Sequence, residues 1–140
     1  MRTELLVVDD RPDKRADITA AARAAGFGSV TEAGAEEQAY ELFDQRNFQV
    51  AVIDLQLKED KEGLNVIRRL REAQPDCRII ALTGALPDEV GVEALQAGAH
   101  DFISSKWLRI NFFDLLSKRL RMWRGVVEGG QTSGAVSATA

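Results

Sequence analysis

Short apolar segments alternate with longer amphipathic segments along this chain of 140 residues. Segments of about four to eight residues rich in Val, Ile and Leu are typical of buried strands. The segments with this pattern are Glu4–Val8, Phe48–Ile53 and Arg78–Leu82, and Phe27–Ala33 and Phe102–Ser104 are a weaker and a shorter expected strand. The segments with apolar residues at helical spacing are Pro12–Ala25, Ala35–Gln45, Leu64–Ala73, Pro87–Ala97 and Asn111–Trp123. The chain is therefore expected to alternate between strand and helix along its length.

This alternation predicts an α/β fold in which a five-stranded parallel sheet is covered by helices on both faces. Right-handed crossover connections leave few strand orders, and the flavodoxin-like order 2-1-3-4-5 fits best. This order places the first and third strands side by side. Ligands of such sheets bind at this switch point, outside the carboxyl ends of the strands.

The composition of the chain changes after the last expected helix. Residues 1–124 are expected to form one domain, which is a usual size for a single hydrophobic core. Residues 125–140 are rich in Gly, Ser, Thr and Ala and contain few large apolar side chains, so we expect them to be disordered. A simple tail and a flexible linker to a further domain are both consistent with this composition.

The bulk properties exclude several classes of function. A net charge of −4 provides no overall basic field for nucleic acid. The single Cys77 excludes an internal disulfide and a cysteine-rich zinc site. A strand begins too early for a signal peptide, and no apolar stretch approaches the roughly 18 residues of a membrane helix. We therefore expect a cytoplasmic protein that contacts neither membrane nor nucleic acid directly.

Polar side chains follow four of the expected strands. Asp9 and Asp10 follow the first strand, Asp54 follows the third, Thr83 the fourth, and Lys106 lies shortly after the fifth. Each alone has a structural explanation, such as helix capping by Asp10 or a solvated surface charge at Lys106. The predicted topology gathers all of them at one edge of the sheet, which favours a functional site.

This combination suits the transfer of a phosphoryl group to a carboxylate. Asp is a known covalent acceptor of phosphoryl groups, so Asp54 is the candidate nucleophile. Asp9 and Asp10 are candidate ligands of Mg²⁺, which prefers one or two carboxylates together with phosphate oxygens and water. The Thr83 hydroxyl and the Lys106 ammonium would stabilise the charge on the transferred group.

The chain resembles the receiver domain of two-component response regulators from Glu4 to Arg124. The motifs that carry the resemblance are Val8-Asp9-Asp10, Val52-Ile53-Asp54-Leu55, Thr83-Gly84, and Gly98-Ala99-His100-Asp101-Phe102-Ile103 ahead of Lys106. Together these motifs and their spacing are specific to that family, although each one alone is weak.

The resemblance implies a phosphorelay function. It identifies Asp54 as the acceptor of a phosphoryl group from a histidine kinase or phosphotransfer protein. It also implies that Asp9 and Asp10, with Asp54 and the main-chain carbonyl of Gln56, bind Mg²⁺. Such a chain is not a conventional enzyme, since it catalyses at most its own phosphorylation and dephosphorylation.

The resemblance further implies a switch. Thr83 and Lys106 correspond to the pair that binds the phosphoryl group, and Thr83 and Phe102 to the residues that move on phosphorylation. Their movement would alter a surface that binds a downstream protein or an output domain outside this chain. Homodimer formation is left open.

Two departures from the family pattern affect the site. Lys106 stands one residue farther from Gly98 than the lysine of the family does, and Trp107 follows it where the family has proline. An ungapped comparison therefore puts Ser105 at the lysine position. The loop after Asp54 also lacks the proline that is usual there.

Other functions remain as alternatives. A docking module with the same fold but no phosphorylation, a pseudo-receiver, is favoured by the shifted lysine. A phosphatase of the haloacid dehalogenase type ranks last, because Gln56 stands where its second acid would be needed. No Gly-x-Gly-x-x-Gly motif follows the first strand, so dinucleotide binding is not indicated.

Overall fold

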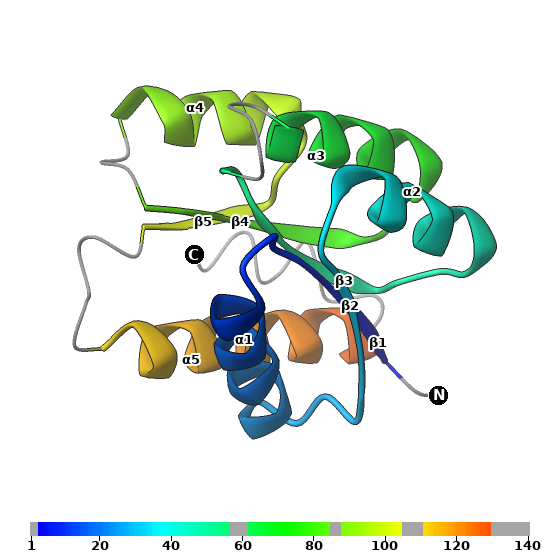
Figure 1. The fold of residues 1–140 in the computed structure, drawn as a ribbon. Helices are drawn as coiled ribbons and strands as arrows, with labels where there is room; N and C mark the ends of the chain where they lie inside the picture. The colour runs from blue at the N-terminus through cyan, green and yellow to red at the C-terminus, as the bar shows by residue number, and fades with distance from the viewer. Residues whose placement is uncertain (1–2, 57–61, 85–87, 105–110, 130–140) are drawn as a thin grey trace.

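A computed structural model of the chain describes residues 3–56, 62–84, 88–104 and 111–129. Its sheet has the order β2-β1-β3-β4-β5 with all neighbours parallel, which confirms the predicted topology (Figure 1). The strands are β1 (Glu4–Val8), β2 (Ser29–Ala33), β3 (Val50–Asp54), β4 (Arg78–Thr83) and β5 (Asp101–Ser104). The helices are α1 (Pro12–Ala24), α2 (Glu36–Gln45), α3 (Glu62–Ala73), α4 (Asp88–Ala97) and α5 (Phe112–Gly129).

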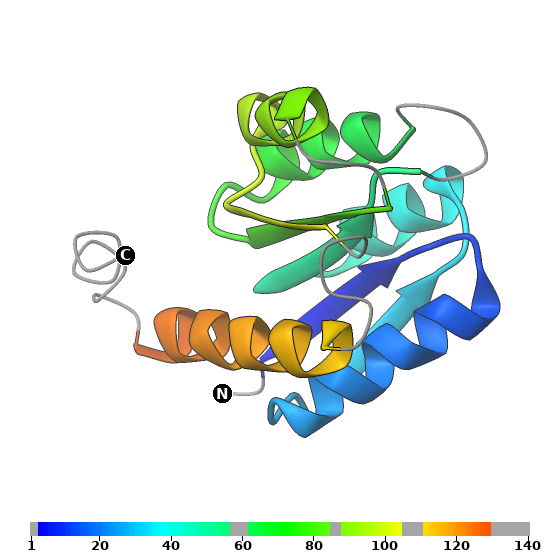
Figure 2. The same ribbon diagram turned by 90° about the vertical axis from the view of Figure 1, so that its left-hand side faces the viewer.

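Helices cover both faces of the sheet, as the continuous apolar strands require (Figures 1 and 2). Helices α1 and α5 lie on one face, and α2, α3 and α4 lie on the other. Successive side chains of a strand point to opposite faces. In β1, Leu5 and Val7 therefore join the core beneath α1 and α5, whereas Leu6 and Val8 join the core beneath the other three helices.

Helix α5 is longer than the sequence predicts. It runs to Gly129, so Gly125–Gly129, which were expected to be disordered, are helical. Val126 is buried, and Glu128 accepts a hydrogen bond of 2.7 Å from the hydroxyl of Thr3. Tertiary packing thus outweighs the weak helix propensity of glycine, and the expected boundary after residue 124 is wrong.

None of the helices in the described part of the chain is long and apolar enough to span a membrane. Residues 130–140, expected to be a tail or linker, lie outside the described residues.

The first turn of α3 lies directly against the end of β3. A Cβ atom added to Gly63 would be 2.3 Å from the main-chain oxygen of Asp54 and 2.5 Å from the Cα atom of Leu55. Neither main-chain atom can move away without distorting the strand end. Glycine at this position therefore allows α3 to pack close to the carboxyl edge of the sheet.

We predict that Gly63→Ala lowers the free energy of unfolding by about 1–3 kcal/mol, because the added methyl group must displace main-chain atoms. Urea denaturation monitored by circular dichroism measures the loss. The matched control is Gly125→Ala in α5, where an added Cβ has no neighbour within 4 Å. This control should be neutral or stabilising by up to about 1 kcal/mol. Equal stability of Gly63→Ala and wild type would contradict the close approach.

Candidate functional site

Two carboxylates lie side by side at the carboxyl edge of the sheet. The register between β1 and β3 pairs Val8 with Ile53, so Asp9 and Asp54 follow on adjacent strands. Both side chains are buried, and Asp9 is completely inaccessible to solvent. The structure therefore brings Asp9 and Asp54 together as the sequence predicts.

Main-chain amides hold one oxygen of each carboxylate. The amide of Arg11 donates a hydrogen bond of 2.9 Å to Asp9 Oδ1. The amide of Gln56 donates a hydrogen bond of 2.8 Å to Asp54 Oδ1. These bonds orient the two side chains and leave their Oδ2 atoms for other partners.

A lysine that the sequence analysis missed contacts both carboxylates. Lys14 Nζ lies 2.7 Å from Asp54 Oδ2 and 3.8 Å from Asp9 Oδ2. The lysine lies in the first turn of α1, where the helix dipole disfavours a cation. A lysine in this unfavourable position, close to the predicted switch point, was the sequence signal that could have indicated the contact.

Burial makes the negative charge of Asp9 unfavourable. The pKa of Asp9 is raised to about 7, mainly by loss of water and also by the neighbouring Asp54, whereas the Arg11 amide and Lys14 act in the opposite direction. Asp9 Oδ2 is buried and has no hydrogen-bond partner. An unpartnered buried carboxylate oxygen is costly unless a cation or a proton satisfies it.

The acidic pair fits the requirements of a hard divalent cation. Its donors are all oxygens, and Mg²⁺ commonly binds through one or two carboxylates while it keeps several waters. Asp10 is only half-buried, and within the described ranges no three Asp, Glu, His or Cys side chains gather as a metal site. Of the three carboxylates expected to converge, the structure thus joins Asp9 and Asp54. Gln56 follows at the surface, next to the pair.

Thr83 lies near Asp54, but its side chain lies on the opposite face of the sheet. Asp54 pairs with Leu82, and Thr83 is the next residue of β4. Ile79 and Ala81 of this strand face the core beneath α3 and α4, and alternation gives Thr83 the same side. The Thr83 side chain is buried at the strand end.

Phe102 packs against α4. The ring is half-buried and contacts the core beneath α3 and α4. A Cβ atom added to Gly91 would lie 3.2 Å from Cε1 of this ring. Gly91 therefore gives the aromatic ring room on the surface of α4. Lys106, Ser105 and Trp107, which the sequence analysis places near the site, lie outside the described residues.

His100 is a structural residue immediately before β5. Its Nδ1 atom accepts a hydrogen bond of 3.0 Å from the amide of Ile79, and its own amide donates to the Ile79 carbonyl at 2.7 Å. Burial lowers the pKa of His100 to about 4. The ring also packs edge-on to Trp123. His100 thereby joins the start of β5 to β4 and to α5.

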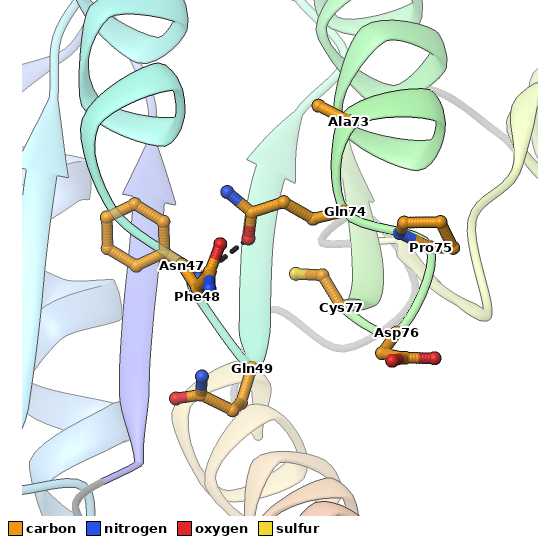
Figure 3. A pocket seen from close by; sticks show the side chains of 8 residues that line it. All are labelled: Asn47, Phe48, Gln49, Ala73, Gln74, Pro75, Asp76 and Cys77. Carbon is orange, nitrogen blue, oxygen red and sulfur yellow. Dashed lines mark hydrogen bonds between the residues drawn. The ribbon is translucent and has the colours of Figure 1, made fainter.

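A surface hollow at the opposite edge of the sheet is a less suitable binding site than the acidic pair. Its walls come from the segments that precede β3 and β4 (Figure 3). Gln74 Oε1 accepts a hydrogen bond of 2.7 Å from the Phe48 amide, drawn in Figure 3, and Nε2 donates to the carbonyls of Phe43 and Arg46. The side-chain amide of Gln74 is therefore used to connect α2, α3 and the start of β3.

Comparisons with known proteins agree with this geometry. A model of the response regulator receiver domain matches residues 5–118. The photosynthetic apparatus regulatory protein RegA of Cereibacter sphaeroides is 38% identical over 112 residues, which are 74% of this chain and 54% of RegA. The chain thus spans about half the length of this relative.

Solved structures show the same fold. A response regulator from Thermotoga maritima is 25% identical, covers 88% of this chain and 98% of its own, and gives a TM-score of 0.75. TrrA of the same organism, solved in complex with Mg(2+)-BeF, is 23% identical, covers 86% of this chain and 98% of its own, and gives a TM-score of 0.72. Since the family model matches most of the sequence and the sheet has the same topology, the chain belongs to the response regulator receiver domains of two-component signalling.

Proposed function

We propose that this receiver domain accepts a phosphoryl group on Asp54 from a histidine kinase or phosphotransfer protein, with Mg²⁺ at the site. The observation that carries the proposal is the buried pair of Asp9 and Asp54 at the ends of β1 and β3. Two adjacent buried carboxylates oppose folding unless a cation offsets their charge. An acceptor that works together with a metal ion gives a functional reason for the pair.

In the proposed reaction, an oxygen of Asp54 attacks phosphorus while the bond between phosphorus and the donor nitrogen breaks. The product is an acyl phosphate on Asp54, and the donor histidine leaves with the electron pair of the broken bond. Asp54 needs no general base when it reacts as a carboxylate. The Gln56 amide, at 2.8 Å from Oδ1, holds the carboxylate in one orientation for the attack.

Asp9 is the proposed principal metal ligand, because its buried Oδ2 lacks a hydrogen-bond partner. Asp54, Asp10 and the main-chain carbonyl of Gln56 are the other proposed ligands. When bound, Mg²⁺ supplies positive charge that stabilises the oxygens of the transferred group. The Mg(2+)-BeF complex of TrrA supports this choice of ion.

Thr83 and Phe102 are the proposed switch. The Thr83 hydroxyl would bind an oxygen of the phosphoryl group, with Lys106 as the proposed cationic partner. Movement of Thr83 toward the phosphoryl group would open space at the end of β4, and Phe102 on neighbouring β5 could turn into it. The face formed by α4, β5 and α5 would then differ between the two states.

The proposed partners are a phosphoryl donor and a downstream protein or output domain. RegA extends beyond the part that this chain matches, so an output domain outside these residues is one source of the response. The residues of this chain are not proposed to contact nucleic acid directly.

We predict that Asp54→Asn abolishes phosphorylation, because the amide is a poor nucleophile and carries no charge. Wild type and variant are incubated with acetyl phosphate and Mg²⁺, and incorporation is measured by intact-mass spectrometry. Asp44→Asn, on the exposed side of α2, is the matched control and should label like wild type. Equal labelling of Asp54→Asn would contradict the proposed role. Absence of labelling in wild type would favour a phosphorylation-independent docking module.

We predict that the Phe102 ring moves when the acceptor is occupied. In nuclear magnetic resonance spectra, the nuclear Overhauser effect between the Phe102 ring and the Gly91 α protons should weaken after Mg²⁺ and beryllofluoride are added. Beryllofluoride imitates the phosphoryl group. The Asp54→Asn variant serves as the control and should keep the signal. An unchanged signal in wild type with saturated beryllofluoride binding would rule out Phe102 as a switch.

We predict that Asp9→Asn stabilises the metal-free domain at pH 8 by roughly 1–3 kcal/mol. The folded pKa of Asp9, about 7, exceeds the ordinary value of 3.8, so the folded state binds more protons between these values. The gain should therefore vanish toward pH 4, grow as pH rises to 7, and then level off. Urea denaturation in EDTA measures it. The exposed Asp13→Asn is the control. A gain that is independent of pH would contradict a buried, unfavourable charge at Asp9.

A further inference from the structure

Lys14 is positioned as an internal counter-cation of the acidic pair. Its ammonium lies 2.7 Å from Asp54 Oδ2 and 3.8 Å from Asp9 Oδ2, and only 21% of its side chain is exposed. Lys14 is the third residue of α1, so its main chain is held in place by a helix rather than by a loop. The contact therefore joins α1 to the ends of β1 and β3.

The two arginines on either side of Lys14 have different partners. Arg15 binds the main-chain oxygen of Asp9 at 2.8 Å and the carboxylate of Glu32 at 3.0 Å. Arg11 is largely exposed and lies 3.8 Å from Asp13. Among the residues that the structure describes, Lys14 is the cation that contacts both carboxylates of the pair.

The position of Lys14 has two costs. A positive charge in the first turn opposes the helix dipole, and a long side chain loses rotamer freedom when it is fixed. The attraction to two buried carboxylates must outweigh both, and it is strong because little water screens these charges. The ion pair is thus a substantial feature of the site in the absence of a divalent ion.

Lys14 and a divalent cation need the same oxygen atoms. The Oδ1 atoms of Asp9 and Asp54 each accept a main-chain hydrogen bond, whereas both Oδ2 atoms face the ammonium. A divalent cation that binds between the carboxylates would meet the positive charge of Lys14 at close range. Two cations in one small acidic site repel each other.

We infer that Lys14 competes with the divalent cation for Asp9 and Asp54 and thereby lowers the affinity of the domain for Mg²⁺. This inference rests on the proposed function, since it takes the acidic pair as the metal site of a phosphoryl acceptor. Lys14 is thus a positioning residue that holds Asp54 when the metal is absent and must leave Oδ2 for the metal to bind. The Mg²⁺ concentration at which the receiver becomes competent for phosphorylation is then set by this contact.

Mg²⁺ binding to the unphosphorylated chain tests the inference. The dissociation constant is measured from the shift of the Gln56 amide resonance as Mg²⁺ is added to wild type, Lys14→Gln and Lys118→Gln. Glutamine removes the charge but retains polar atoms, and Lys118 is an exposed lysine of α5 that gives the same change in net charge.

We expect Lys14→Gln to bind Mg²⁺ about tenfold more tightly than wild type, because one close like charge is removed. Lys118→Gln should bind like wild type. Equal or weaker binding by Lys14→Gln, with measurable binding by wild type, would overturn the inference about Lys14 but leave the metal site intact. No Mg²⁺ binding by any of the three proteins would overturn both the inference and the proposed metal-assisted function.

A second measurement needs only the wild-type protein and therefore does not depend on how the variant folds. The ¹⁵Nζ resonance of Lys14 is followed during the Mg²⁺ titration. We expect it to shift with the same midpoint as the Gln56 amide, as the ammonium leaves Asp54. A Lys14 resonance that stays unchanged at saturating Mg²⁺ would overturn the inference.

Discussion

The burial of two neighbouring carboxylates, Asp9 and Asp54, is the constraint on which the site depends. Their charges repel, and removal from water raises the pKa of Asp9. The surrounding elements offset this cost with oriented main-chain amides from Arg11 and Gln56 and with the ammonium of Lys14. These contacts need a rigid edge of the sheet, and the buried carboxyl ends of strands β1 and β3 provide it.

The fold positions these groups through simple alternation and close packing. Asp9 and Asp54 each end a strand on the face that α1 covers, so the first turn of α1 can reach both. Gly63 lets α3 approach the main chain of Asp54 from the other side. Thr83 ends the neighbouring strand β4, and its side chain lies on the opposite face of the sheet, which α3 and α4 cover. The proposed acceptor and the proposed switch thus occupy one edge but different faces of the sheet.

The order of the strands and the pairing of Asp9 with Asp54 could be predicted because short apolar runs and their terminal carboxylates are local features of the sequence. The contact of Lys14 was missed because a lysine near the start of a helix is usually solvated, and only the tertiary structure shows where it points. The extent of α5 was missed for a related reason. Gly125 signals a helix end, whereas the burial of Val126 and the bond between Glu128 and Thr3 come from tertiary packing.

The central claim is that the carboxylate of Asp54, rather than that of Asp9 or Asp10, carries the phosphoryl group. The most direct test is to phosphorylate the wild-type chain, reduce the acyl phosphate with borohydride, and locate the modified residue by peptide mass spectrometry. Reduction converts a phosphorylated aspartate into homoserine and leaves free carboxylates unchanged. We predict homoserine at position 54 alone. Modification at Asp9 or Asp10, with Asp54 intact, would contradict the account.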